Sequence, residues 1–229
     1  MIRFLFLFVL SVAAGALPLP PPLETSHLLG KGRPSGEPPV PLEDQLWALG
    51  WSRNNAFAYL ERRQTDQGQR NVRIRVMDLV EDKVLWEQQW PDWGDQDGQA
   101  AWWPLHETEV QRVFGQFGLE PTELQLGTFP LILGEDFYSL SLRSTRRSDD
   151  PTWIERLEVA VNSTGRGLKT VSEGSGFWRW ATLLGFVPSP YEGRVALLIL
   201  VQPAGWQGAK QPLRFLVTGL SLKAGFPKP

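Results

Sequence analysis

The side chains that most often act in catalysis or metal binding are scarce in this chain. The sequence has two histidines, His27 and His106, and no cysteine. Without cysteine there is no thiol nucleophile, thiolate metal ligand or disulfide. His27 lies in a proline-rich stretch, so a folded region can draw on His106 alone, and a site built from two or three histidines is excluded. We therefore predict no metal and no cofactor.

His106 stands beside acidic residues near the expected start of a helix. Positions 106 and 109 share a helix face, so His106 and Glu109 could offer two ligands to a metal. Acidic residues in a first helical turn are also what the helix dipole favours, and we prefer that interpretation. A serine hydrolase needs a base beside its nucleophile, and the loosely matching residues 172–176 lie between expected strands. No catalytic residue is predicted.

Paired carboxylates are the second kind of chemistry to consider. A glycosidase needs two carboxyl groups that face each other across the sugar. The candidates lie in loops or at a helix end, and they are Glu107, Glu109, Glu135, Asp136, Asp149 and Asp150. Nothing in their spacing sets two of them opposite, so glycan hydrolysis is the alternative function rather than the first.

The acidic run at residues 92–98 resembles part of a calcium-binding loop. The full pattern places oxygen ligands at alternate positions before the glycine and a glutamate after it. Trp93 is the residue at position 93, and Pro104 stands where the glutamate would be. We therefore favour a solvated acidic turn over a calcium site.

Tryptophan is the most unusual feature of the composition. The chain has eleven tryptophans, and five of them lie between 86 and 103: Trp86, Trp90, Trp93, Trp102 and Trp103. Aromatic rings on a β-surface stack against sugars, and tryptophan is also favoured in protein interfaces. Trp86 and Trp90 share one face of an expected strand, which also fits a core position. Because Trp93, Trp102 and Trp103 flank polar loops, they are harder to bury together. We predict a ligand-binding surface at Trp90, Trp93, Trp102 and Trp103.

The elements that position these residues are expected to be mostly strands. Apolar and alternating runs between turn signals predict an antiparallel meander at 45–52, 56–63, 72–77 and 84–90. One helix is expected near 107–117, with Gly118 as its C-cap. Later strands are expected at 130–133, 137–142, 153–161, 178–187, 194–201 and 213–222. The fold class is mainly β, and periodicity leaves a sandwich and an incomplete propeller-like array both open.

The first residues have the layout of a secretory signal peptide at 1–16. Arg3 precedes an apolar stretch that ends in small residues, so we expect cleavage between Ala16 and Leu17. The apolar stretch is shorter than the roughly 20 residues that span a bilayer as a helix. The predicted location is therefore secreted or periplasmic.

A proline-rich segment follows at 17–41. Eight prolines between 18 and 41 predict a semi-stiff linker rather than a folded element. The β-rich domain then covers 42–229, either as one unit or as two halves, 42–118 and 119–229. The formal net charge is −2 and no basic tract is present, so a nucleic-acid partner is not expected.

Two segments that combine glycine with aromatic residues carry a family resemblance. Residues 184–196, together with 219–222 and 225–226 near the end, resemble DUF2259, a family of predicted secreted bacterial proteins of unknown function. Residues 49–52 are similar to the opening segment of that family. The turn at 53–55 departs from the family because it lacks the expected Asp-Gly. The resemblance implies export and supplies no catalytic residue.

These observations lead to one functional hypothesis and one alternative. The first is an exported, non-catalytic envelope protein that binds a protein partner or a polymer such as a glycan through an aromatic-rich β-surface. The alternative is a hydrolase that acts on envelope glycans with paired carboxylates. No integral membrane span is expected after removal of the signal peptide, and the sequence leaves the oligomeric state open.

Overall fold

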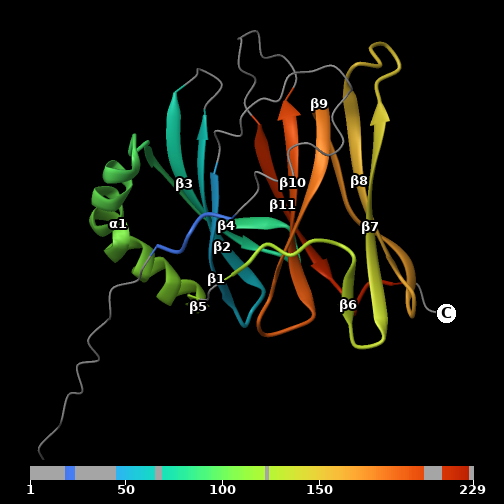
Figure 1. Ribbon diagram of the computed structural model, residues 1–229, viewed down its shortest axis with the longest axis horizontal. Coiled ribbons are helices and arrows are strands. Elements are labelled where there is room, and N and C mark those ends of the chain that lie inside the picture. The colour runs from blue at the N-terminus through green and yellow to red at the C-terminus, as the bar shows by residue number, and fades with distance from the viewer. Residues whose placement is uncertain (1–18, 24–44, 65–68, 122–123, 204–212, 227–229) are drawn as a thin grey trace, which may run out of the picture.

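The computed structural model describes residues 19–23, 45–64, 69–121, 124–203 and 213–226. This part of the chain forms two antiparallel sheets and one α-helix (Figure 1). The predicted fold class, mainly β with one helix, is therefore confirmed. The signal peptide, with Ala16 and Leu17, and most of the predicted linker lie outside the described residues.

The first sheet has five strands in the order β4-β3-β2-β1-β5. Its strands are β1 (Gln45–Ser52), β2 (Ala56–Gln64), β3 (Arg70–Asp78), β4 (Lys83–Pro91) and β5 (Leu119–Glu120). The first four form the meander that the alternating pattern predicted. Asn55 in the β1–β2 turn has a φ of 68°, a conformation that asparagine tolerates better than most residues.

The second sheet has six strands in the order β11-β10-β9-β8-β7-β6. They are β6 (Leu131–Leu133), β7 (Asp136–Arg146), β8 (Ile154–Ser163), β9 (Gly167–Pro188), β10 (Arg194–Pro203) and β11 (Arg214–Ser221). Gly127 adds an isolated antiparallel bridge to Phe186, in the last part of β9. A side chain at Gly185 would collide with the Gly127 carbonyl oxygen, 2.2 Å from the added Cβ, so this close approach requires glycine there.

The two sheets pack face to face as a sandwich. Their shared core contains Phe57 and Tyr59 from β2 together with Leu198 and Leu200 from β10, all of them buried. A core built from the inner faces of two sheets is the arrangement of a β-sandwich. Of the two arrangements that periodicity left open, the sandwich is therefore the one that forms.

The outer face of the five-stranded sheet is covered by helix α1 (Gln96–Phe117), as Figure 1 shows. Val110 and Val113 of the helix pack against buried residues of the sheet such as Ile74 and Val76. A third core cluster lies on the six-stranded sheet, where Val159 of β8, Phe186 of β9 and Leu197 of β10 are buried.

The helix begins earlier than its predicted start at 107. Asp95 is the N-cap, and its side chain accepts a hydrogen bond from the Gly98 backbone N–H at 2.9 Å. The acidic run that resembled a calcium loop is therefore the cap and first turn of α1. The predicted C-cap is confirmed, since Gly118 has a φ of 61°.

The beginning of the predicted linker lies against the sandwich. The Leu23 backbone N–H donates to the Leu46 carbonyl oxygen at 2.7 Å, and the Leu23 side chain is buried between the sheets. Leu19 packs against the cluster under α1. In the described part of the chain, no helix is both long enough and apolar enough to cross a membrane.

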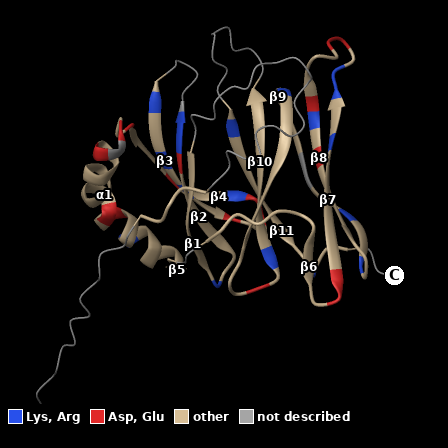
Figure 2. Ribbon diagram, viewed as in Figure 1, with Lys and Arg blue, Asp and Glu red and all other residues tan. Residues whose placement is uncertain are grey.

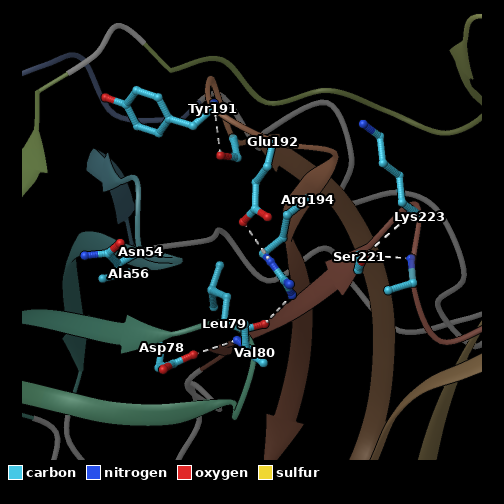
Figure 3. Close-up of polar contacts among 12 residues, drawn as sticks. Asn54, Ala56, Asp78, Leu79, Val80, Tyr191, Glu192, Arg194, Ser221 and Lys223 are labelled. Atoms are coloured by element: carbon cyan, nitrogen blue, oxygen red, sulfur yellow. Dashed lines mark hydrogen bonds and ion pairs between the residues drawn. The ribbon is translucent and has the colours of Figure 1, made fainter.

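The two sheets are also joined by polar contacts at one end of the sandwich (Figure 3). Arg194 at the start of β10 donates through Nη1 to the Leu79 carbonyl oxygen at 3.0 Å and through Nε to Glu192 at 3.0 Å. Asp82 in the β3–β4 turn accepts from the Thr218 hydroxyl at 2.7 Å and from the Gly219 N–H at 2.6 Å. We call these contacts the inter-sheet clamp.

Candidate functional site

The four tryptophans predicted as a binding surface form a cluster between α1 and the five-stranded sheet. Trp93, Trp102 and Trp103 are only 9%, 8% and 7% exposed, and Trp90 is half-buried. The ring centroids of Trp90 and Trp102 lie 5.5 Å apart, and those of Trp93 and Trp102 lie 5.3 Å apart. The expectation that Trp93, Trp102 and Trp103 are hard to bury together is therefore wrong.

The early start of α1 explains this burial. Trp102 and Trp103 lie within the helix rather than in a loop before it, so they face the sheet instead of the solvent. Trp93 is held by Arg62, whose guanidinium carbon lies 5.4 Å from the indole centroid and whose nitrogens bind Asp92 at 2.7 and 2.8 Å. A flat ligand cannot stack on these indoles unless α1 moves, so the cluster is not an exposed stacking surface.

His106 belongs to the same cluster. Its ring centroid lies 4.3 Å from that of Trp102 and 5.0 Å from that of Trp90. Burial lowers the pKa of His106, although nearby Glu109 opposes that shift. Among the described residues no group of three histidine or acidic side chains is placed to hold a metal ion.

An open groove lies elsewhere, on the face of the six-stranded sheet over β7, β8 and β9. It has a volume of about 530 Å³ and is lined by Thr145, Glu155, Arg156, Gly174 and Ser175. The strand register explains why these residues meet, because Arg156 of β8 pairs with Thr145 on one side and with Ser175 on the other. Residues directly opposite each other in antiparallel strands share a face.

An aromatic side chain stands two residues beyond Ser175 on β9. Phe177 is 56% exposed, and the guanidinium carbon of Arg147 lies 4.9 Å from its ring centroid. The Arg147 Nε donates to Asp149 at 2.7 Å, and this hydrogen bond lowers the pKa of Asp149 to about 2. The strand that lines the groove therefore also carries an exposed ring with a cation held against it.

Four of the six carboxylates considered for hydrolysis have separate local partners. Glu107 accepts from Gln111 at 3.0 Å, Asp136 accepts from Arg166 at 3.1 Å, and Asp149 and Asp150 lie in the β7–β8 turn with Arg147 and Thr152. Among the described residues that line the groove, Glu155 is the single carboxylate. The described lining therefore supplies one of the two carboxyl groups that a glycosidase needs.

Sequence reasoning did not find this groove. Its signal was the small-residue run at 174–176 followed by Phe177 and Trp178. Residues 172–176 were expected to lie between strands, and this expectation is wrong because they belong to β9. The charged pair Glu155 and Arg156 sits at a β-bulge of the β8–β9 register, and only the paired structure sets it beside that run.

No protein-family model, curated protein or solved structure matches this chain. The resemblance to DUF2259 therefore stays a prediction.

Proposed function

We propose that this protein is an exported, non-catalytic binding protein of the cell envelope whose groove over β7, β8 and β9 holds a glycan. The observation that carries the proposal is a polar groove of about 530 Å³ whose β9 wall continues into an exposed phenylalanine. Export is supported by the signal-peptide layout of residues 1–16. The binding surface proposed here replaces the buried tryptophan cluster.

The chemistry of the groove suits a sugar chain. Thr145 and Ser175 offer hydroxyl groups, while Glu155 accepts and Arg156 donates hydrogen bonds to sugar hydroxyls. Phe177 provides an apolar ring face of the kind on which a pyranose stacks. A few polar groups beside an aromatic surface are the common composition of small-molecule and polymer sites.

Binding without turnover is favoured because Glu155 is the one carboxylate among the described residues that line the groove. Glycoside hydrolysis requires an acid and a second carboxyl group acting from the opposite side of the sugar. Glu155 alone fits the role of a hydrogen-bond acceptor.

Co-sedimentation of the purified protein with insoluble peptidoglycan tests the proposal. Phe177→Ala should weaken retention on the order of 3- to 10-fold, because it removes one aromatic contact with the sugar. Arg156→Ala should weaken retention further. Leu105→Ala is the matched control, because Leu105 is 79% exposed on α1, away from the groove.

Two outcomes would contradict the proposal. One is that the wild-type protein is not retained, and the other is that Phe177→Ala behaves like Leu105→Ala. Release of reducing sugar that stops in Glu155→Gln would favour the hydrolase instead.

A further inference from the structure

Four polar residues face the space between the two sheets at the end opposite the inter-sheet clamp. In the β2–β3 ladder Arg63 lies opposite Asn71, and Glu61 lies opposite Arg73. Residues two positions apart on a strand point to the same face of the sheet, so Tyr59 shares a face with Glu61 and Arg63. Tyr59 lies in the core between the sheets, and the four polar residues therefore face that space as well. We call Glu61, Arg63, Asn71 and Arg73 the polar quartet.

Three members of the polar quartet are buried and the fourth is half-buried. Glu61 is 1% exposed, Asn71 5% and Arg73 6%, and Arg63 is half-buried. The Arg73 guanidinium donates to Glu61 Oε2, so one ion pair lies within the quartet. Buried charges are ordinarily retained only when they are paired and hydrogen-bonded.

Every member of the quartet nevertheless has an atom without a partner. These atoms are Glu61 Oε1, Arg63 Nε, Asn71 Oδ1 and Arg73 Nε, four of the seven such buried side-chain atoms in the described part of the chain. Native proteins leave few buried polar atoms unsatisfied, because each one is costly. Two unpaired donors and two unpaired acceptors on neighbouring rungs of one ladder therefore indicate a place for a polar ligand.

The charge around the quartet is positive. Arg75 binds Glu87, and Arg73 Nη1 lies 3.7 Å from the same Glu87 carboxylate. Burial lowers the pKa of Arg63, repulsion from Arg73 adds to this effect, and attraction to Glu61 opposes it. Figure 2 shows basic residues toward the upper ends of strands in both sheets.

The described charges at this end are unequal. Arg63, Arg73 and Arg75 of the β2–β3 ladder stand against Glu61 and Glu87, so three positive charges face two negative ones.

The ligand must satisfy donors and acceptors together and carry negative charge. Sulfate and carboxylate groups only accept hydrogen bonds, so they would leave Glu61 Oε1 and Asn71 Oδ1 unpaired. Inorganic phosphate at neutral pH is an anion that still has an O–H group, which can donate to an acceptor while its other oxygens accept from arginine. We propose that the polar quartet binds inorganic phosphate in its protonated form.

Thermal unfolding of the purified full chain at pH 7.5 tests this proposal. Phosphate at about 10 mM should raise the Tm by at least about 2 °C relative to chloride at equal ionic strength, and sulfate should raise it less. Glycerol phosphate, whose dianion lacks an O–H on phosphorus, should behave like sulfate. This arm separates free phosphate from a phosphomonoester as the ligand.

Variants locate the effect. Arg63→Gln should abolish the phosphate shift, and Arg63→Lys should retain part of it because the charge is kept. Arg53→Gln is the control, since Arg53 is an exposed arginine in the β1–β2 turn, with 74% of its side chain accessible. The variant with Phe177→Ala in the groove should keep the full phosphate shift, so this inference and the proposed function fail separately.

Equal shifts with phosphate and sulfate, or no shift with either, would overturn the proposal and leave water as the occupant of the quartet. A phosphate shift that persists unchanged in both Arg63 variants would overturn it as well.

Discussion

The two ends of the space between the sheets use similar residues in different ways. At the inter-sheet clamp, the Asp82 carboxylate receives a hydroxyl and a backbone N–H, and Arg194 reaches a carboxylate and a carbonyl. At the other end, the polar quartet pairs Arg73 with Glu61 and leaves four atoms unsatisfied. The charged groups of the clamp bind other groups of the protein, whereas the quartet keeps two donor atoms and two acceptor atoms without a partner.

The comparison shows what separates a structural polar contact from a binding site in the same fold. Asp82 of the clamp is exposed, and it accepts hydrogen bonds from Thr218 and Gly219 of the opposite sheet. Glu61 and Arg73 of the quartet are buried, where an unpaired polar atom is costly. The quartet draws its members from adjacent strands of one sheet, so the groups that complete it must come from elsewhere.

The largest expected effect comes from breaking the ion pair in the quartet. Arg73→Met leaves the Glu61 carboxylate buried without its cation and should cost about 3–5 kcal/mol of unfolding free energy in urea titrations. The double variant Glu61→Met with Arg73→Met should recover much of this loss, because no buried charge is left alone. A double variant as unstable as the single one would show that the pair is not the source of the cost.

At the clamp, Asp82→Ala should cost about 1–3 kcal/mol, because the Thr218 hydroxyl and the Gly219 N–H lose their acceptor. Urea titration measures the loss, and it should not depend on phosphate. Glu81→Ala in the same turn is the control, and as an exposed position it should stay within about 0.5 kcal/mol of wild type. If the loss of unfolding free energy in Asp82→Ala depended on phosphate, the clamp would be a phosphate site too, and the proposed difference between the two ends would be wrong.

The smallest expected effect is a pH dependence near the clamp. Burial, and then repulsion from Arg194, lowers the pKa of Lys169 from 10.5 to about 8. Between these two values the unfolded chain binds a proton that the folded chain does not, so stability should rise as the pH increases from 8 to 10.5.

Solvent screening at this partly exposed lysine limits the rise to on the order of 1 kcal/mol. Comparing Lys169→Met with wild type by urea titration across this pH range cancels the contribution of other groups. If the difference between the two proteins does not change with pH, Lys169 is not the titrating group.

Local patterns predicted most of the strands. The alternation at 72–77 and the turn at Asn55 act over a few residues, so they can be read without knowing the partner strands. Gly118 was likewise predictable, because a helix C-cap in the left-handed region needs only the residue itself. The start of α1 was not predicted, since acidic residues and glycine before Pro104 read equally well as a loop.

The candidate sites were less predictable than the fold. Five tryptophans between 86 and 103 suggested a surface, but their burial depends on α1 packing over β-strands that lie earlier in the chain. The groove needs Thr145, Arg156 and Ser175 in register on three strands. The quartet forms only when Glu61 and Arg63 of β2 lie opposite Arg73 and Asn71 of β3 and the second sheet packs over them.

The sequence by itself determined the mainly β character, the meander, the C-cap of the helix and the absence of cysteine chemistry, because each depends on residue types or on spacing over a few positions. Only the tertiary structure decided which polar residues are buried, which tryptophans are hidden and where a groove opens. Those properties depend on strand register and on packing between distant segments, and neither is encoded in any single stretch of the chain.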